Sequence, residues 1–168
     1  MGIESLTTKE KKEARRLPVV SLGAEHLAMG YLMRRNILAY KAPPYNAGYD
    51  LICVHPSNAK KLIRVQVKSR YQTDCDRAFP VKEKTIDAFE YLIVVFMNIG
   101  YFYRRKPVLE GFTELELYTL PAEWIRKHHK IMESGWQKVH TKGEALDEFK
   151  NEKGIEAIAK ALEIDYPR

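Results

Sequence analysis

The side chains best suited to chemistry in this sequence lie between positions 49 and 70. Residues 49–54 and 62–70 are rich in β-forming types, and a polar turn centred on Asn58 separates them, which predicts a hairpin. If the hairpin is symmetric about Asn58, Asp50 lies directly opposite Gln66, because each is eight residues from Asn58. Directly opposed side chains have Cβ atoms about 4.5–5.5 Å apart. Lys68 follows on the same face, since side chains alternate along a strand.

An acid, an amide and an ammonium would therefore share one patch. Such an oxygen-rich patch suits Mg²⁺, which prefers octahedral oxygen ligands and takes one or two carboxylates from a protein. The lysine would act as a point charge beside a phosphate or an attacking water. The same triplet also fits an ordinary surface hairpin with a solvated basic face, so the interpretation needs support from elsewhere in the chain.

That support comes from Glu25, on a helix expected over residues 21–36 with Ser21 as its cap. The expected buried stripe of this helix consists of Leu27, Ala28, Tyr31 and Leu32. Glu25 precedes Ala28 by three positions and so shares the apolar face. A carboxylate there must be paired, hydrogen-bonded or metal-bound. If Glu25 does not bind a metal, the alternative is an ion pair with a nearby arginine such as Arg64 or Arg70.

The remaining pattern predicts a single α/β domain over residues 21–168, preceded by a basic arm over residues 1–20. Strands are expected at 37–41, 91–97, 101–106 and 115–120, and the uniformly apolar 91–97 belongs in the middle of the sheet. Residues 73–84 are expected to be irregular, with a helical turn at 85–89. Helices are expected at 121–133 and, rich in acids, at 154–162.

Charge is unevenly distributed along the chain. The net charge is +6 with a pI near 9.2, but residues 26–73 alone hold eight basic side chains against one acid. Residues 144–165 reverse the balance, with seven acids against three lysines. The basic segment predicts an anionic partner near the proposed site.

Other candidate residues carry weaker signals. Cys53 and Cys75 lack the number and spacing of a disulfide framework or a zinc site, which indicates a reducing intracellular, cytoplasmic setting. No apolar run is long enough to span a membrane. His128 and His129 are adjacent and read as a solvated basic helix end. The aromatic and basic residues at 101–106 fit either an alternating strand or a nucleic-acid platform.

Glu25, Asp50 and the run Gln66-Val67-Lys68, in this order of elements, resemble the PD-(D/E)xK nuclease superfamily. The sequence looks most like its small branch, which includes a group I intron homing endonuclease in which glutamine replaces the second acid. The resemblance covers roughly residues 21–97. It implies a restriction-endonuclease-like fold, a mixed central sheet flanked by helices with an αβββαβ core. Tyr49 stands where the motif's name has proline.

By this resemblance, Glu25 and Asp50 would be metal ligands, Gln66 would offer its amide oxygen, and Lys68 would position or help deprotonate the attacking water. The implied activity is Mg²⁺- or Mn²⁺-dependent phosphodiester hydrolysis by a DNA endonuclease, with RNA as the other substrate. Surrounding bases would contact phosphates: Arg34, Arg35, Lys60, Lys61, Arg64 and Arg70. The alternative is an inactive nuclease-fold protein that binds nucleic acid or a partner. The subunit number, including a homodimer or higher homo-oligomer, stays open.

Overall fold

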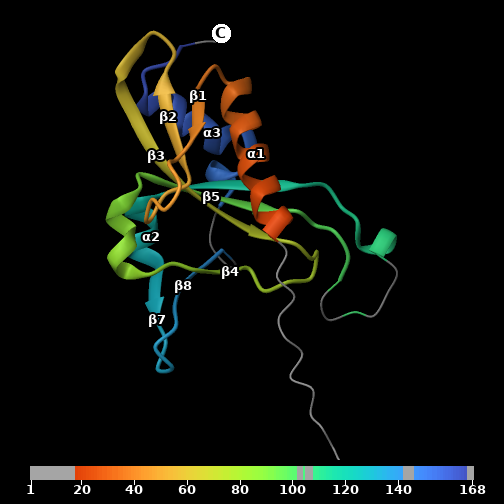
Figure 1. Ribbon diagram of the computed structural model, residues 1–168. Coiled ribbons are helices and arrows are strands. Elements are labelled where there is room, and N and C mark those ends of the chain that lie inside the picture. The colour runs from red at the N-terminus through yellow and green to blue at the C-terminus, as the bar shows by residue number, and fades with distance from the viewer. Residues whose placement is uncertain (1–17, 102–103, 105–107, 142–145, 166–168) are drawn as a thin grey trace, which may run out of the picture.

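A computed structural model describes residues 18–101, 104, 108–141 and 146–165. The predicted basic arm up to residue 17 and most of the segment 101–106 lie outside the described residues. The centre of the fold is a five-stranded mixed sheet, confirming the predicted α/β class (Figure 1). In spatial order its strands are β1 (Leu38–Lys41), β2 (Leu51–His55), β3 (Asn58–Arg70), β5 (Tyr91–Phe96) and β6 (Glu116–Pro121).

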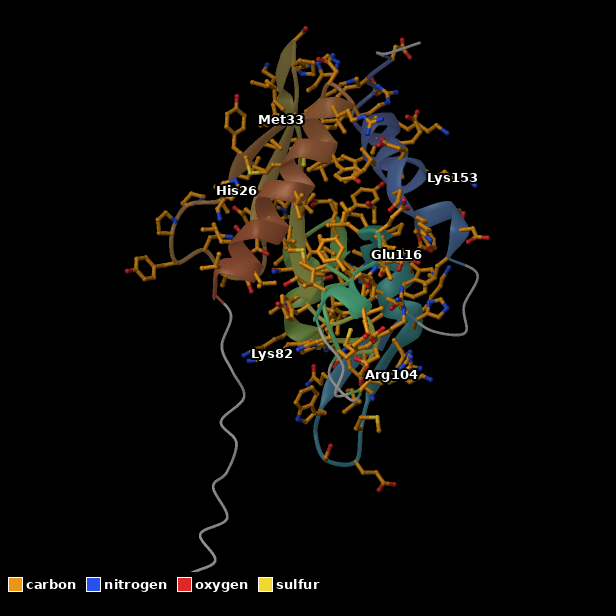
Figure 2. All side chains as sticks on the ribbon, turned by 90° about the vertical axis from the view of Figure 1, so that its right-hand side faces the viewer. His26, Met33, Lys82, Arg104, Glu116 and Lys153 are labelled. Atoms are coloured by element: carbon orange, nitrogen blue, oxygen red, sulfur yellow. The ribbon has the colours of Figure 1, made fainter. Side chains whose placement is uncertain are left out.

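Helices and a small second sheet cover the two faces of the central sheet. On one face, α1 (Pro18–Arg34) and α3 (Asn151–Ala161) lie side by side and share a core with the strands (Figures 1 and 2). The other face is covered by α2 (Ala122–His128), the 3₁₀ helix η1 (Glu83–Ala88) and the second sheet. That sheet has the order β4 (Ala78–Pro80), β8 (Gln137–His140), β7 (His129–Ile131). Two short 3₁₀ helices complete the described elements, η2 (Val108–Gly111) and η3 (Asp147–Phe149). None of the described helices has the length and apolar character that crossing a bilayer requires.

β5 is buried on both faces, as its uniformly apolar sequence predicts. Leu92, Val94 and Phe96 face the core beneath α2, whereas Ile93 and Val95 face the core beneath α1 and α3. β5 runs parallel to β3 and antiparallel to β6. A parallel neighbour requires a crossover, and here β4 and η1 lie within it.

The predicted register of the β2–β3 hairpin is confirmed. Leu51 pairs with Val65, which places Asp50, the next residue outward, opposite Gln66. The turn itself is not symmetric, because His55 pairs with Asn58 and the register shifts between Val54 and His55. Residues 59–61 of β3 take up the mismatch as an irregularity of the kind made by a bulge. The register therefore holds although the turn differs from the expected one.

The first helix begins earlier than predicted. α1 starts at Pro18 rather than after Ser21, since proline's fixed φ and missing N–H suit a first helical turn. Its buried stripe is Ala24, Ala28 and Leu32, so the expectation for Leu27 was wrong. The small alanines let the helix lie close to the sheet, and Leu27 points to solvent.

The helix predicted over 121–133 ends at His128, and the β7–β8 hairpin follows it. Tertiary contacts explain the difference: the His129 ring lies 2.7 Å from the Val81 carbonyl, and β8 buries Val139 beside Phe79 of β4. β4 itself lies in the stretch predicted to be irregular. A three-residue strand with two buried residues gives too short an alternation to be recognised from sequence.

A substitution at Gly48 tests the backbone conformation and close packing of the loop that leads to Asp50. Its φ is +102°, and an added Cβ would lie 2.4 Å from Cβ of Ala88. We expect Gly48→Ala to lower the free energy of unfolding by about 1–3 kcal/mol. Gly30→Ala is the matched control: it lies inside α1 with open space around it, and should raise stability by about 0.5–1 kcal/mol. Urea denaturation measures both, and a Gly48→Ala variant as stable as the wild type would contradict this account.

Candidate active site

The candidate site lies beside the first residue of β2, where β3 continues beyond its pairing with β2. The ladder between these strands stops at Leu51 and Val65, reinforced by a hydrogen bond of 2.9 Å from Asp50 N to Val65 O. β3 runs on to Arg70 with β5 paired along its other side. Among the described residues, no strand pairs with the free edge of β3 from Gln66 onward. Backbone groups along that edge are therefore available to side chains.

Asp50 occupies the end of this ladder. Its carbonyl accepts a hydrogen bond of 2.8 Å from Ala42 N, so its backbone is held between β1 and β3. Its carboxylate Oδ2 accepts from Val67 N at 2.8 Å and from Gln66 Nε2. The Val67 N–H lies on the free edge, so the carboxylate takes the place that a neighbouring strand would have filled.

Burial raises the pKa of Asp50 above its ordinary value, because a charge is disfavoured away from water. The Val67 N–H opposes this effect, whereas the negative charge of Glu25 adds to it. Lys68 and Lys41 lower the pKa again, but less. The net rise means that burial outweighs the groups that stabilise the Asp50 carboxylate, and a bound cation would offset this cost.

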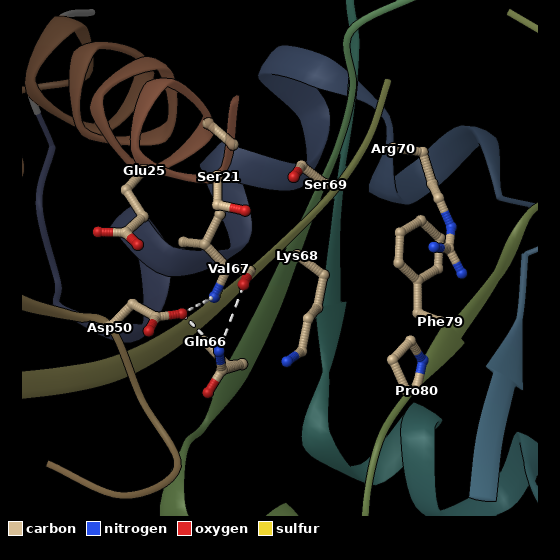
Figure 3. A pocket seen from close by; sticks show the side chains of 11 residues that line it. Ser21, Glu25, Asp50, Gln66, Val67, Lys68, Ser69, Arg70, Phe79 and Pro80 are labelled. Carbon is tan, nitrogen blue, oxygen red and sulfur yellow. Dashed lines mark hydrogen bonds between the residues drawn. The ribbon is translucent and has the colours of Figure 1, made fainter. Parts of the chain in front are cut away.

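All four predicted site residues line one pocket of about 290 Å³ (Figure 3). Glu25 comes from α1, Asp50 directly precedes β2, and Gln66 and Lys68 come from β3, while Phe79 of β4 closes the far side. The four candidates therefore come from three neighbouring parts of the chain: α1, the residue before β2, and β3. The sheet edge allows α1 on one face and the polar face of β3 to meet at the same opening.

Glu25 is mostly buried, with its side chain 19% exposed, and it forms an ion pair with Lys41 at the end of β1. The predicted alternative partners, Arg64 and Arg70, do not contact it; Arg64 pairs instead with Glu90 at 2.5 Å. Lys41 pairs with Leu51, the residue after Asp50, and this register brings the Lys41 side chain to Glu25 at the pocket. Sequence reasoning missed this lysine because only the β1–β2 register brings it to the pocket.

Gln66 differs in one respect from its predicted role. Its amide nitrogen, not its oxygen, faces Asp50, and it also donates to the Val67 carbonyl at 3.2 Å (Figure 3). A half-turn of the terminal amide would bring Oε1 to the same position. The Val67 carbonyl is a further oxygen at the pocket that sequence reasoning missed, because a backbone group leaves no signal in the residue type.

The donor set fits a hard cation. Asp50 and Glu25 supply carboxylates, and Gln66 and Val67 supply an amide and a carbonyl, all of them oxygen donors of the kind that Mg²⁺ takes. Among the described residues, no three His, Cys, Asp or Glu side chains converge as a metal-binding group. A cation held here would therefore depend on water or phosphate oxygens to complete its shell.

Of the six bases predicted to contact phosphates, Arg70 is the one that lines the pocket. Its Nη2 donates to the Ala78 carbonyl, and its guanidinium lies 5.1 Å from the centroid of the Phe79 ring. Four others are ion-paired: Arg34 with Glu152, Arg35 with Glu156, Lys61 with Glu163 and Arg64 with Glu90. Lys60 lies at the exposed tip of the hairpin.

The remaining candidates have structural roles. Burial raises the pKa of the Cys53 thiol to about 12, so it stays protonated and is a poor nucleophile or metal ligand. His128 stacks on Trp124 with ring centroids 4.0 Å apart, and His129 lies against the Val81 carbonyl. The expectation that these two histidines form a solvated helix end was therefore wrong.

The chain is similar in fold to a bacterial homing endonuclease, I-Ssp6803I, whose structure has been solved. The TM-score is 0.52 at 12% sequence identity, and the match covers 89% of this chain and 95% of that chain. At this identity the likeness shows a shared fold, in agreement with the predicted restriction-endonuclease-like architecture. No family model and no curated protein sequence matches the chain.

Asp50→Asn tests the electrostatics of the pocket. Because burial raises the pKa of Asp50 in the folded state, protonation of Asp50 favours folding. This stabilisation is complete below the pKa of Asp50 in the unfolded chain and is lost as the pH rises through its pKa in the folded protein. The asparagine Oδ1 can still accept from Val67 and Gln66. In EDTA at pH 7 we therefore expect the variant to be at least as stable as the wild type, with an advantage that shrinks on acidification toward about pH 4.

Thermal unfolding followed by circular dichroism measures this difference at each pH. Ser57→Ala, at the exposed turn of the same hairpin, serves as the control and should show no pH-dependent difference from the wild type. A constant loss of stability in Asp50→Asn at every pH would show that the carboxylate charge is not disfavoured by its surroundings.

Proposed function

We propose that this chain is a metal-dependent nuclease that hydrolyses phosphodiester bonds in DNA. The observation that carries the proposal is the convergence of Glu25, Asp50, Gln66 and Lys68 on one pocket at the free edge of β3. The fold likeness to a homing endonuclease supports the same class of activity. In this proposal the four residues form a variant of the PD-(D/E)xK motif with glutamine at its second acidic position.

Each side chain then has a distinct role. Glu25 and Asp50, with the oxygens of Gln66 and Val67, would hold Mg²⁺ or Mn²⁺. When bound, such a cation polarises a phosphoryl oxygen and makes a water molecule more acidic. Lys68 extends into the pocket (Figure 3), where its ammonium would orient the attacking water or the phosphate.

Lys41 and Arg70 complete the surroundings of the site. Lys41 holds the Glu25 carboxylate near Asp50 and limits the repulsion between the two acids. Arg70 presents a cation at the opposite end of the pocket, beside Phe79, where a second phosphate of the same strand would lie. RNA is the alternative substrate, and the cleavage assay below includes it.

The second candidate function is a nuclease-fold module that binds nucleic acid without cleaving it. The internal pairing of the acids favours it: Glu25 pairs with Lys41, and Asp50 accepts from both Gln66 and Val67. These contacts satisfy both carboxylates within the protein. The same cleavage experiment separates the two candidates.

We expect Asp50→Asn and Lys68→Ala each to reduce Mg²⁺-dependent cleavage by about 100-fold or more, because one removes a ligand charge and the other the cation beside the phosphate. Purified protein would be incubated with labelled duplex DNA, branched DNA, single-stranded DNA and RNA, with Mg²⁺, with Mn²⁺ or with EDTA. Circular dichroism would confirm that both variants remain folded.

Lys153→Ala is the control for Lys68→Ala, since it removes a lysine that is exposed on α3 and lies outside the pocket. It should retain wild-type cleavage. Cleavage by Asp50→Asn at the wild-type rate would refute the assigned site, whereas binding without cleavage by the wild type would favour the second candidate.

Gln66→Glu tests whether residue 66 faces a metal. The change keeps the side chain's size and adds a third carboxylate, so affinity for Mn²⁺ without substrate should rise by about tenfold. Glu25→Gln should have the opposite effect, with a small change in melting temperature. Isothermal titration of Mn²⁺ into wild type and both variants gives these affinities, and equal values for Gln66→Glu and wild type would remove Gln66 from the metal site.

A further inference from the structure

The β7–β8 hairpin presents an exposed tryptophan beside a hydrogen-bonded turn. Trp136 is 62% exposed, although large aromatic side chains are usually much more buried. Its carbonyl accepts from Met132 N at 2.8 Å, and Gly135 N donates to Met132 O at 2.8 Å with a φ of +79° at Gly135. The hairpin protrudes from the body of the domain (Figure 1). These hydrogen bonds fix the backbone of the turn that carries the exposed indole.

Two contacts fix this hairpin to the segment that follows β4. Gln137 accepts a hydrogen bond of 2.5 Å from Glu83 N through its side chain, and one of 3.2 Å from Val81 N through its carbonyl. On the other strand, His129 lies against the Val81 carbonyl. Trp136 therefore has a defined position relative to the segment that carries Lys82 and Lys84.

Trp136 lines an open groove of about 580 Å³ together with Lys82 and Lys84. Both lysines are exposed, and within the described residues neither takes part in an ion pair. Figure 2 shows Lys82 extending away from the ribbon. Lys130 and Lys138 stand directly opposite each other on β7 and β8, a like-charged pair that disfavours the isolated hairpin. Neither of these two lysines lines the groove, but both lie on the same hairpin and add positive charge to its surroundings.

The groove adjoins the candidate active site. Pro80, the last residue of β4, lines both the active-site pocket and the groove with Trp136. A DNA strand that runs from Lys68 past Pro80 would therefore next reach the indole of Trp136. The aromatic face and the flanking ammonium groups match a nucleotide, whose base can stack while its phosphates contact lysines.

We propose that this groove binds an unpaired nucleotide of the DNA strand whose phosphodiester lies in the active-site pocket. In duplex DNA both faces of an internal base are already stacked on neighbours, so an exposed indole selects a base outside the duplex. The preferred substrate is then DNA with an unpaired segment beside the scissile bond, such as a flap. The inference rests on the proposed function for the position of that bond, whereas the binding of the unpaired strand can be measured separately.

The test compares a labelled duplex with the same duplex carrying a central single-stranded flap, in EDTA to prevent cleavage. Trp136→Ala should weaken binding of the flapped DNA by about tenfold or more and leave the fully paired duplex within about twofold, the effect expected for the loss of one stacked base. Trp136→Phe should restore most of the affinity. Phe112→Ala, which removes an aromatic residue 60% exposed outside the groove, is the matched control.

The lysines give a second readout. The double variant Lys82→Gln, Lys84→Gln should reduce the slope of log affinity against log salt by about 1.4 for the flapped DNA, as expected for the loss of two contacts to single-strand phosphates. Fluorescence of a Trp124→Phe protein, in which Trp136 is the remaining tryptophan, should be quenched by the flapped DNA and not by the paired duplex.

Equal affinity of wild type and Trp136→Ala for the flapped DNA would overturn the inference, and so would an equal loss on both DNAs. A shift to smaller assemblies of Trp136→Ala in sedimentation, without a selective loss on flapped DNA, would show that the groove holds a second copy of the chain instead. If the wild type cleaves DNA and Trp136→Ala binds the flapped DNA as tightly as the wild type, the nucleotide-binding groove is refuted and the proposed nuclease stands. Selective binding through Trp136 without any cleavage refutes the proposed nuclease and leaves the groove.

Discussion

The site depends on a difference in length between two neighbouring strands. β2 starts at Leu51, whereas β3 extends to Arg70, so among the described strands the far half of β3 has a partner on one side only. The backbone N–H of Val67 would otherwise lack an acceptor at that edge, and the carboxylate of Asp50 supplies one. This hydrogen bond holds the half-buried carboxylate of Asp50 at the point where the β2–β3 ladder stops. The other site residues gather around this point because α1 reaches the edge from one face and Lys68 from the other.

The distribution of charge has an equally simple cause. The acidic α3 packs beside α1, and its glutamates neutralise Arg34 and Arg35 at the end of α1 far along the helix from Glu25. Glu163, just after α3, does the same for Lys61 near the hairpin tip. The basic character of residues 26–73 is therefore largely balanced at one end of the domain. Cations remain available at the other end, where the pocket and the groove meet at Pro80.

Much of this arrangement was predictable from the sequence because it rests on short-range alternation. The two faces of β3, the pairing of Asp50 with Gln66 and the burial of β5 follow from period-two patterns. The ion partners were not predictable, since Lys41 reaches Glu25 only through the β1–β2 register and Glu156 reaches Arg35 across 121 residues. The β7–β8 hairpin was missed because helix-forming residues continue through Glu133, and its strands are stabilised by β4, a partner distant in sequence.

The asymmetric turn of the β2–β3 hairpin separates the site from the hairpin's tip. The mismatch between the strands is absorbed at residues 59–61, and the ladder from Leu62 to Val65 pairs with β2 in a regular register. We therefore expect insertions or deletions in the exposed tip to leave Asp50 opposite Gln66. The tip is thus the part of this hairpin where a change of length, a tag or an inserted domain should least disturb the site.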